Sequence, residues 1–438
     1  MVKSLSAEPL QGLRRTEISQ IGTLLPYLGY ESGDLAVNGV PVRELWPGRH
    51  PLIIFLPERA ADNYRALHEA FSEHFNVSIH YALKSCYMPA VVRALRKAGA
   101  GIEVMSRFEW ELADRYGFTA DTVLANAVRR DERLRSDLLQ ADVKAVGVDG
   151  IEELDAVCET ARRLDLQVRV SIRVNPLDCD SFFSQDTKLG TNADDVGHLL
   201  ETALKSPYVS TVGIHAHQLR KCAGPDLFGK QARAVGELVT AVSTGRRRVD
   251  MVNLGGGLES RFQMERSGVS CADFAQAARD ALQNLPPETE LVLEPGRFLV
   301  SDAAIALTGV LGPKQANDIR WLVTEIGTNT LSPYADRSYQ PLPLTLADEG
   351  DELWGSYHIT DPLAVSNVFC PDAELPRSVE DSALALLDCG AYSSVYAQLW
   401  GCALPDLAVM ENGRLRSAFD ASSRESMRES MYGGESGA

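Results

Sequence analysis

The amino-acid sequence predicts an α/β protein in which a (β/α)₈ barrel is joined to a mostly β domain. Two observations predict this fold. From about residue 51 to residue 305, short apolar stretches alternate with segments that carry helix signals. After about residue 305, helical periodicity fades and the apolar stretches have the pattern of strands. Eight strands separated by helices in about 250 residues are typical of a barrel.

The first predicted barrel strand ends at a lysine. Apolar residues alternate with other residues from Phe75 to Leu83, and this period of two is typical of a β-strand. Lys84 follows directly, Pro89 suits the first turn of a helix and Gly99 suits its end. After the lead-in "PLIIFLP" (51–57), we expect strands at 77–84, 101–105, 122–126, 145–149, 168–174, 211–217, 250–254 and 290–296.

The segments between these strands predict helices. One example is "DGIEELDAVCETARRL", for which Asp149 is a candidate N-cap. The alternative topology is an open doubly wound sheet, but no GxGxxG lies at a strand–helix turn to support it. We therefore expect the barrel to occupy residues 51–305.

The two ends of the chain are expected to form the second domain, from residues 1–50 and 306–438. "RWLVTEIGT", "GSYHI" and "LALLDCG" have strand patterns, and "LAVMENGRLRS" predicts a hairpin with Asn412–Gly413 at its turn. The first 50 residues are irregular and are expected to join this domain. The polar, Gly-rich end "RESMRESMYGGESGA" predicts a frayed tail.

Composition excludes some classes of partner. The 438 residues carry a formal net charge of -17, which disfavours nucleic acid and anionic membranes because both need a basic face. The eight cysteines form no CxxC pair, which is typical of reduced thiols in the cytosol. The start of the chain has no apolar signal core, and no run approaches the roughly 20 apolar residues of a membrane span. We expect a soluble, cytoplasmic protein.

Reactive side chains lie where the predicted strands end, which is where barrels place their sites. Strand one ends in Lys84 and strand six in "HAH", with His215 and His217. Strand seven ends in "NLGGGL" (residues 253–258), and strand eight in "EPGR" (residues 294–297). These ends supply an amine, imidazoles, a glycine-rich turn, a carboxylate and a guanidinium.

Each feature has a purely structural interpretation as well. A strand-end lysine is usually a solvated rim residue, and three glycines often form only a tight turn. Glu294 and Arg297 can simply form ion pairs. The HxH pair has the geometry of two metal ligands, but no third His or Cys lies at another strand end, so we expect no metal.

The combination is more specific than its parts. Barrels commonly bind phosphate with the loops after strands seven and eight, which here carry Gly255, Gly256, Gly257 and Arg297. Glycine lets backbone N–H groups approach an anion, and arginine matches phosphate oxygens. A phosphate site near a strand-end lysine indicates a phosphorylated cofactor that forms a Schiff base, pyridoxal 5′-phosphate.

The order of the motifs then points to a family. "YALKS", "GIHAH", "NLGGGL", "EPGRFLV", "FC" followed by "PDAE", and "CGAY" occur in this order over nearly the whole chain. The chain resembles the fold-type III pyridoxal-phosphate decarboxylases, the group of diaminopimelate, ornithine, arginine and carboxynorspermidine decarboxylases. The resemblance implies an alanine-racemase-like barrel plus a β-domain, and a head-to-tail homodimer with shared active sites.

The resemblance also implies a role for individual residues. Lys84 corresponds to the family's Schiff-base lysine, His217 to the histidine that stacks on the pyridine ring, and Glu294 to the acid that pairs with the pyridinium nitrogen. Cys370 corresponds to a cysteine that enters the neighbouring subunit's site and takes part in Cα reprotonation. Glu103 stands where the family has an acidic residue near the cofactor. Phosphate binding is implied for Gly255, Gly256, Gly257, Arg297 and Tyr392.

Two departures concern the residues that read the substrate. After the HxH, the family's "GS" is replaced by Gln218 to Lys221, and Arg220 either replaces the missing serine contact or faces the substrate. Pro371 follows Cys370 where the family has an acidic residue, with Asp372 next, and Arg337 is a candidate for the substrate carboxylate. We therefore expect the substrate to be a modified or conjugated diamino acid, in siderophore or other specialised metabolism.

Two other functions stay open at this point. An amino-acid racemase shares the barrel, the lysine and the cofactor, although the HxH, EPGR and Cys370 features favour decarboxylation. A non-catalytic homologue that only carries the cofactor is expected to lose Lys84 or the phosphate residues, and both are present.

Overall fold

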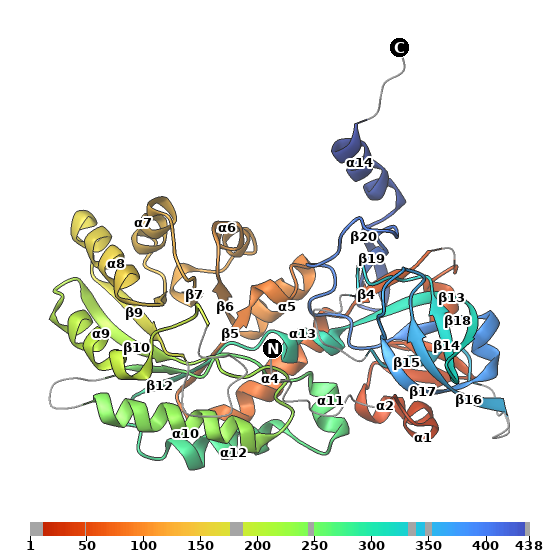
Figure 1. Cartoon of the computed structure of the whole chain (residues 1–438), viewed down its shortest axis with the longest axis horizontal. Helices are drawn as coiled ribbons and strands as arrows, with labels where there is room; N and C mark the ends of the chain where they lie inside the picture. The colour runs from red at the N-terminus through yellow and green to blue at the C-terminus, as the bar shows by residue number, and fades with distance from the viewer. Residues whose placement is uncertain are drawn as a thin grey trace. The chain divides into compact units, whose positions relative to one another are not determined.

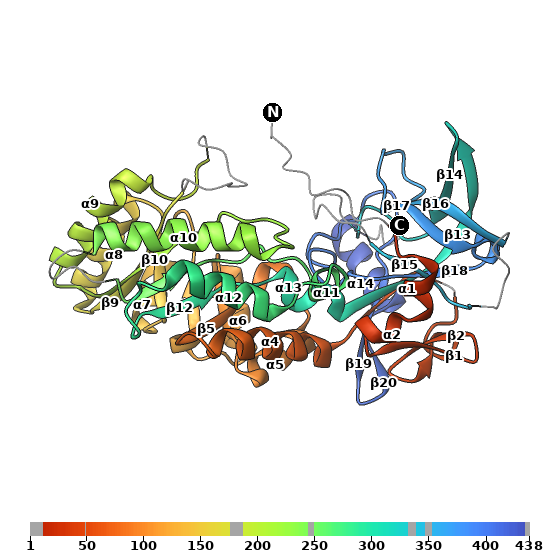
Figure 2. The ribbon, with the colours of Figure 1, turned by 90° about the horizontal axis from the view of Figure 1, so that it is seen from below.

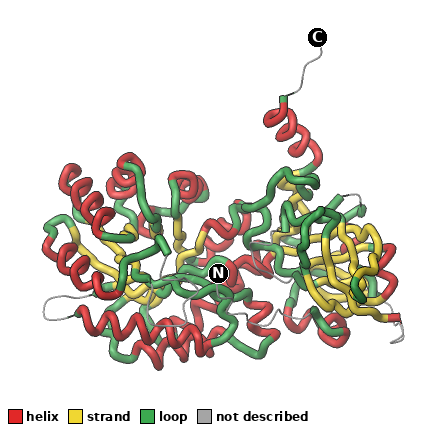
Figure 3. Tube along the Cα trace, in the orientation of Figure 1, coloured by secondary structure: helices red, strands yellow, loops and turns green. Residues whose placement is uncertain are grey.

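The structure, a computed structural model, describes residues 12–48, 50–175, 187–243, 249–331, 339–346 and 353–433. The chain forms two compact units. One is Ala61–Leu299, and the other combines the described parts of Ser6–Ala60 and Val300–Ala438. Helices dominate the first unit and strands the second (Figure 3). Arg337 lies outside the described residues.

The first unit contains the predicted barrel. Among the described residues, eight parallel strands close on themselves in the order β10-β11-β12-β5-β6-β7-β8-β9. The barrel prediction is confirmed, and the open doubly wound sheet is excluded by this closure. The strands are β5 (Val77–Ala82), β6 (Gly101–Val104), β7 (Val123–Ala125), β8 (Ala145–Val148), β9 (Val168–Arg173), β10 (Val209–His215), β11 (Met251–Asn253) and β12 (Glu290–Leu293).

Helices surround these strands (Figure 1), and α10 and α12 run side by side along the outside (Figure 2). Inside the barrel, Leu124, Ala145, Met251 and Val292 form a buried apolar cluster from strands on opposite sides. The helices of this unit are α4 (Pro57–Ser72), α5 (Pro89–Ala98), α6 (Arg107–Arg115), α7 (Glu132–Gln140), α8 (Ile151–Leu164), α9 (Ala193–Lys205), α10 (Pro225–Val242), α11 (Arg261–Arg266), α12 (Cys271–Leu282) and α13 (Arg297–Val300).

Local signals set several helix ends. Pro89 begins α5, and Gly99 ends it with a φ of 110°, as the sequence predicts. The prediction of Asp149 as the N-cap of α8 was wrong, because Gly150 occupies that position. The Asp149 carboxylate instead accepts a hydrogen bond of 2.8 Å from the Gly190 N–H.

The second unit is built on a large mixed sheet. Its main path runs β17-β16-β14-β13-β4-β19-β20, with β18 and β15 attached to β13. The strands are β4 (Leu52–Phe55), β13 (Ala304–Ala316), β14 (Ile319–Thr324), β15 (Pro341–Pro343), β16 (Trp354–Thr360), β17 (Cys370–Pro376), β18 (Ala383–Leu386), β19 (Asp406–Glu411) and β20 (Arg414–Phe419).

Three features of this unit differ from the sequence interpretation. β4 lies in the predicted barrel range of 51–305, yet it pairs with β13 and β19. The first 50 residues are more regular than expected, and α14 (Ala421–Tyr432) occupies most of the stretch predicted to be frayed. The N-terminal elements are α1 (Arg15–Ser19), α2 (Ile21–Leu24), β1 (Leu28–Glu31), β2 (Asp34–Val37), β3 (Val40–Pro41) and α3 (Val42–Leu45), with β1–β3 forming a small sheet.

Candidate active site

Lys84 lies in a single 3₁₀ turn directly after β5. The turn, Leu83–Ser85, is held by the Ser85 hydroxyl, which donates to the Ala82 carbonyl at 2.7 Å. Behind it, the buried Tyr81 hydroxyl donates to the Cys86 carbonyl at 2.8 Å. Because these contacts fix the turn on both sides, the Lys84 side chain starts from a defined position at the end of β5.

Glu103 on β6 is the partner of this amine. The Lys84 Nζ lies 2.6 Å from Glu103 Oε2, and the carboxylate is 2% exposed. Burial raises the pKa of Glu103, the charge of Glu294 raises it further, and Lys84 opposes the shift. The structure thus brings together two predicted site residues, in an ion pair whose carboxylate accepts a proton more readily than that of an ordinary glutamate.

Glu294, directly after β12, is held as a carboxylate. Its Oε1 accepts hydrogen bonds of 2.7 Å from Asn126 Nδ2 and from Asn253 Nδ2, and its Oε2 lies 3.4 Å from His215 Nε2. Burial by itself raises the pKa of Glu294, but His215, Lys84 and the Asn253 amide outweigh it and hold the pKa well below its usual range. Glu294 therefore keeps a negative charge inside the barrel.

His217 is a neutral imidazole in this site. Burial, together with the positive charges of Arg173 and Lys84, lowers the pKa of His217 to about 3. The Gly256 N–H donates to His217 Nδ1 at 2.9 Å, so this nitrogen is the acceptor and Nε2 carries the proton. The hydrogen bond fixes both the tautomer and the position of the ring beside the glycine-rich turn.

The glycine-rich turn brings three backbone segments very close together. A Cβ on Gly256 would lie 2.3 Å from the Glu294 carbonyl oxygen, and one on Gly257 would lie 2.3 Å from that of Leu219. Gly255 and Gly257 also adopt φ values of 67° and 91°, which favour glycine. The Gly255 N–H donates to Asn253 Oδ1 at 2.7 Å. Two of the three glycine amides thus contact side chains of the site.

The loop after the HxH motif is joined to this turn. The Cys222 N–H donates to the Gly257 carbonyl at 2.8 Å. From α10, buried Gln231 accepts from the Gln218 N–H at 2.9 Å and donates to the Leu254 carbonyl at 2.8 Å. The departure from the family's "GS" is therefore an ordered loop, and it carries the partly buried Arg220.

Arg297 begins α13 and is almost completely buried. Its Nε lies 3.9 Å from Glu259 Oε1, and both side chains are about 9% exposed. Glu259 Oε1 also accepts a hydrogen bond of 2.8 Å from the Ser260 N–H. The guanidinium thus belongs to the loops after the last two barrel strands, where the sequence predicts phosphate binding.

The remaining predicted site residues belong to the β unit. Cys370, fully buried, begins β17. Between the pairs Ile359–Cys370 and Tyr357–Ala373 the register shifts, so that His358 on β16 faces both Pro371 and Asp372. Pro371 and Asp372 thus form a β-bulge, and bulges of this kind redirect side chains near functional sites.

Asp372 and Tyr392 both have a left-handed backbone. Asp372 has a φ of 49°, and its Oδ1 lies 3.7 Å from His358 Nδ1. Tyr392 has a φ of 56° and stacks on Tyr396 with ring centroids 5.9 Å apart. Such backbone strain clusters at functional sites, so it supports the functional roles predicted for these two residues.

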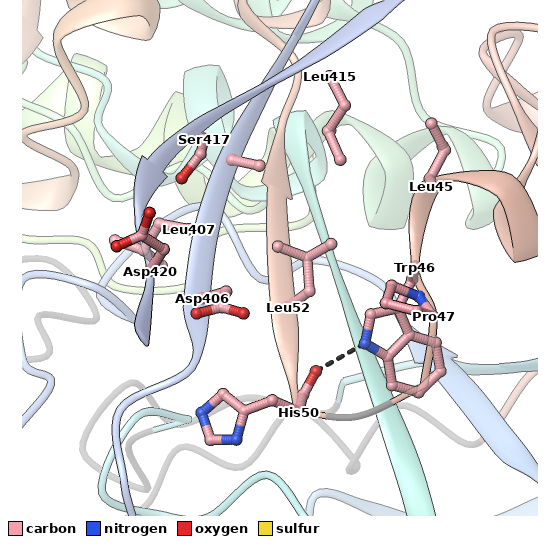
Figure 4. Close-up of a pocket in the computed structure, with 11 residues that line it drawn as sticks. Leu45, Trp46, Pro47, His50, Leu52, Asp406, Leu407, Leu415, Ser417 and Asp420 are labelled. Atoms are coloured by element: carbon pink, nitrogen blue, oxygen red, sulfur yellow. Dashed lines mark hydrogen bonds between the residues drawn. The ribbon is translucent and has the colours of Figure 1, made fainter. Parts of the chain in front are cut away.

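A surface pocket of the β unit carries none of these residues (Figure 4). It encloses about 330 Å³ and is lined by Trp46, His50, Asp406 and Asp420, among others. Three of its polar side chains already have partners: Trp46 donates to the His50 carbonyl, Asp406 pairs with Arg424, and Asp420 caps α14.

Sequence reasoning missed Asn126, Asn253 and Gln231. Asn253 had a usable signal, because it stands at the end of a predicted strand and directly before "LGGGL". Asn126 also ends a predicted strand, but an isolated amide has no distinctive spacing. Among the described residues, no group of three or more His, Cys, Asp or Glu side chains is arranged to hold a metal ion. None of the described helices is long and apolar enough to cross a membrane.

Comparisons with known proteins extend this picture. The curated diaminopimelate decarboxylase of Aquifex aeolicus is 26% identical over 377 residues, which is 84% of this chain and 88% of the relative. That of Methanothermobacter thermautotrophicus is 28% identical over 386 residues, covering 83% and 87%. The crystal structure of diaminopimelate decarboxylase from M. jannaschii with L-lysine has the same fold, with a TM-score of 0.80, 23% identity and coverage of 91% and 97%.

A family model settles the class. The model for the pyridoxal-binding domain of the pyridoxal-dependent decarboxylases matches residues 60–301, more than half of the chain. This match confirms the resemblance inferred from the motifs. The chain therefore belongs to the pyridoxal-dependent decarboxylases, and it is an amino-acid carboxy-lyase that uses pyridoxal 5′-phosphate.

Proposed function

We propose that this enzyme decarboxylates a free diamino acid of the diaminopimelate type, and that Lys84 is the residue that binds its cofactor. One observation carries the assignment of the site: Lys84 Nζ stands 2.6 Å from Glu103 and in the field of Glu294, inside the barrel that the family uses for pyridoxal binding. An amine held between carboxylates in a barrel has the chemistry that capture of an aldehyde requires.

The donor set fits the cofactor. Lys84 supplies the amine for the aldehyde, ionised Glu294 supplies a partner for a pyridinium nitrogen, and Arg297 supplies a guanidinium for a phosphate. Neutral His217 provides an uncharged aromatic ring beside them. When bound, pyridoxal phosphate supplies the electron-accepting ring that stabilises the electron pair left on Cα as carbon dioxide departs.

The charges of the chain's own residues serve this chemistry. Glu294, ionised and buried, keeps a proton on the ring nitrogen by charge pairing. Glu103, whose pKa is raised, can accept the proton that the Lys84 ammonium must lose before the amine attacks an aldehyde. His217 adds no positive charge that would compete with the ring nitrogen for Glu294, because its pKa is about 3.

The choice of substrate rests on the relatives. The two curated relatives described above carry the name diaminopimelate decarboxylase and match more than four fifths of this chain. None of the reported relatives is described as acting on a modified or conjugated amino acid, so that expectation, and the expectation of specialised metabolism, have no support in the comparisons. We propose Arg220 and Asp372 as residues that contact the substrate, and Cys370 as the residue that returns a proton to Cα.

We further propose a homodimer that works in the cytoplasm. The β unit exposes a cluster of apolar side chains on the loops that precede Cys370 and follow Tyr392: Val365 (38% exposed), Tyr396 (52%), Leu399 (36%) and Trp400 (47%). The two loops meet, because a Cβ on Gly401 would lie 2.4 Å from Leu363 Cδ2. Several large apolar side chains together at the surface are typical of a protein interface. A second copy of the chain is the partner that the resemblance implies for this surface.

Mass spectrometry tests the proposed reaction. The cofactor-loaded enzyme is incubated with meso-diaminopimelate, ornithine, arginine, lysine and conjugated diamino acids. We expect diaminopimelate to lose one carbon dioxide and yield lysine at the highest kcat/KM. Faster turnover of a conjugated diamino acid would refute the proposed substrate, and deuterium uptake at Cα without mass loss would indicate racemisation.

Borohydride reduction tests the role of Lys84. The wild-type chain is expected to retain the reduced cofactor at Lys84, because reduction turns an imine into a stable amine. Lys84→Ala should retain none. Peptide mapping that finds the label on another lysine, or an unchanged label in Lys84→Ala, contradicts the assignment.

A further inference from the structure

The amides that hold Glu294 come from two separate strand ends. Asn126 follows β7, and Asn253 is the last residue of β11; both donate to the same carboxylate oxygen at 2.7 Å. Gly147 leaves room for this arrangement, because a Cβ there would lie 2.4 Å from Asn126 Oδ1. Hydrogen bonds from neutral amides to a buried carboxylate are short and strong, and they favour its ionised form.

Asn253 also contacts the glycine-rich turn, whereas Asn126 does not. Its Oδ1 accepts the Gly255 N–H at 2.7 Å, while its Nδ2 donates to Glu294. The two contacts fix the orientation of the amide, because a carboxylate requires the N–H₂ and a backbone N–H requires the oxygen. The side chain is 1% exposed, so water does not replace either contact.

The backbone closes this connection into a ring. The Glu294 N–H donates to the Gly255 carbonyl at 2.7 Å, so Glu294 and Gly255 are joined once through the backbone and once through Asn253. Gly255, with a φ of 67°, also lies against His217, because a Cβ on it would be 2.7 Å from His217 Nδ1. A movement of the carboxylate therefore moves the start of the glycine-rich turn, and the reverse.

We propose that Asn253 is a positioning residue that couples the two ends of the cofactor site: the carboxylate for the ring nitrogen and the glycine-rich turn for the phosphate. This inference rests on the proposed role of Glu294 and on the phosphate binding that the resemblance implies for the glycine-rich turn. Asn126 acts on the carboxylate alone. The two asparagines thus separate a local effect on Glu294 from the coupling between Glu294 and the turn.

The test uses three variants that divide these contacts. Asn126→Leu removes one donor to Glu294 and leaves the turn untouched. Asn253→Leu, close to asparagine in shape, removes the other donor and also the oxygen that accepts the Gly255 N–H. Asn253→Ala removes the same two contacts with a smaller side chain. The cofactor-free proteins are titrated with pyridoxal 5′-phosphate and with pyridoxal, which lacks the phosphate, and binding is followed by absorbance.

The readout is the dissociation constant of pyridoxal divided by that of pyridoxal 5′-phosphate. This ratio isolates the contribution of the phosphate to binding. We expect Asn126→Leu to weaken binding of both ligands and to leave this ratio at the wild-type value. In Asn253→Leu we expect the ratio to fall about tenfold, the free energy of roughly one hydrogen bond. A ratio in Asn253→Leu equal to that in Asn126→Leu overturns the proposal.

Two controls separate the possible failures. If Asn253→Leu does not fold, judged by circular dichroism and thermal unfolding, Asn253→Ala tests the proposal, because it removes the same two contacts and should lower the ratio in the same way. If the wild-type chain shows no gain from the phosphate, the proposed phosphate role of the turn fails. If the wild-type gain is present and Asn253→Leu keeps it, only the coupling through Asn253 fails.

Discussion

Two carboxylates at the barrel mouth have pKa values that are shifted in opposite directions, because their surroundings differ. Burial raises the pKa of Glu294, but His215, Lys84 and the Asn253 amide outweigh it, so the pKa falls. For Glu103, burial and the like charge of Glu294 outweigh the lowering effect of Lys84, so the pKa rises. Two carboxylates with pKa values driven in opposite directions are the usual sign of an acid–base site.

His217 gives a prediction for the stability of the cofactor-free protein. Its pKa falls from an ordinary value of 6.5 to about 3, so the folded state binds fewer protons than the unfolded state between these limits. Stability is therefore lost as the pH falls from about 6.5 towards 3. His217→Asn, which can still accept the Gly256 N–H, should show a shallower loss over this window in urea denaturation. Parallel pH profiles for the two proteins would contradict the assignment.

At the scale of elements, the site depends on contacts between loops rather than within them. The HxH loop, the glycine-rich turn and α10 are connected through Gln231, whose amide bonds one backbone group in each loop. The isolated bridge between Cys222 and Leu258 adds a short parallel pairing between the same two loops. The residues that replace the family's "GS" are therefore ordered by a helix on the outside of the barrel.

Removal of this connection has a measurable cost. Gln231→Leu leaves the buried Gln218 N–H and Leu254 carbonyl without their partner, so we expect a loss of about 1–3 kcal/mol in the free energy of unfolding. The control is Gln276→Ala on α12, an exposed glutamine that bonds Asp280. It should change stability by less than about 0.5 kcal/mol. Equal effects in urea denaturation would show that Gln231 has no structural role of this kind.

At the scale of the whole molecule, the apolar cluster of Val365, Tyr396, Leu399 and Trp400 predicts the assembly. Sedimentation should give a species of twice the 47.8 kDa chain mass. Trp400→Asp should shift it to the monomer and reduce activity, because a charge in an apolar interface is left without a partner. Leu311→Asp, at a 58% exposed leucine on β13, is the matched control and should leave the dimer intact. A dimer that survives Trp400→Asp places the interface elsewhere.

The sequence predicted the barrel because every strand was short, apolar and followed by a helix signal, and its main site residues because they stand where strands end. Lys84, Glu294 and the glycine-rich turn were predicted as site residues in this way. β4 was grouped with the barrel because "LIIF" is a continuous apolar run, and such a run does not reveal which sheet receives the strand. Asn126 and Asn253 were missed because their importance comes from a carboxylate that is distant in sequence.

The pairing of β4 with β13 has a consequence for synthesis of the chain on the ribosome. Residues 52–55 find their partners at 304–307 and 406–409, so this strand cannot complete its sheet until almost the whole chain has emerged. The barrel between them, Ala61–Leu299, has local strand neighbours and is complete much earlier. β4 therefore gains its first partner, β13, soon after the barrel is complete, but its other edge stays unpaired until residues 406–409 have emerged. During this interval the open edge exposes the nascent chain to aggregation and to chaperones.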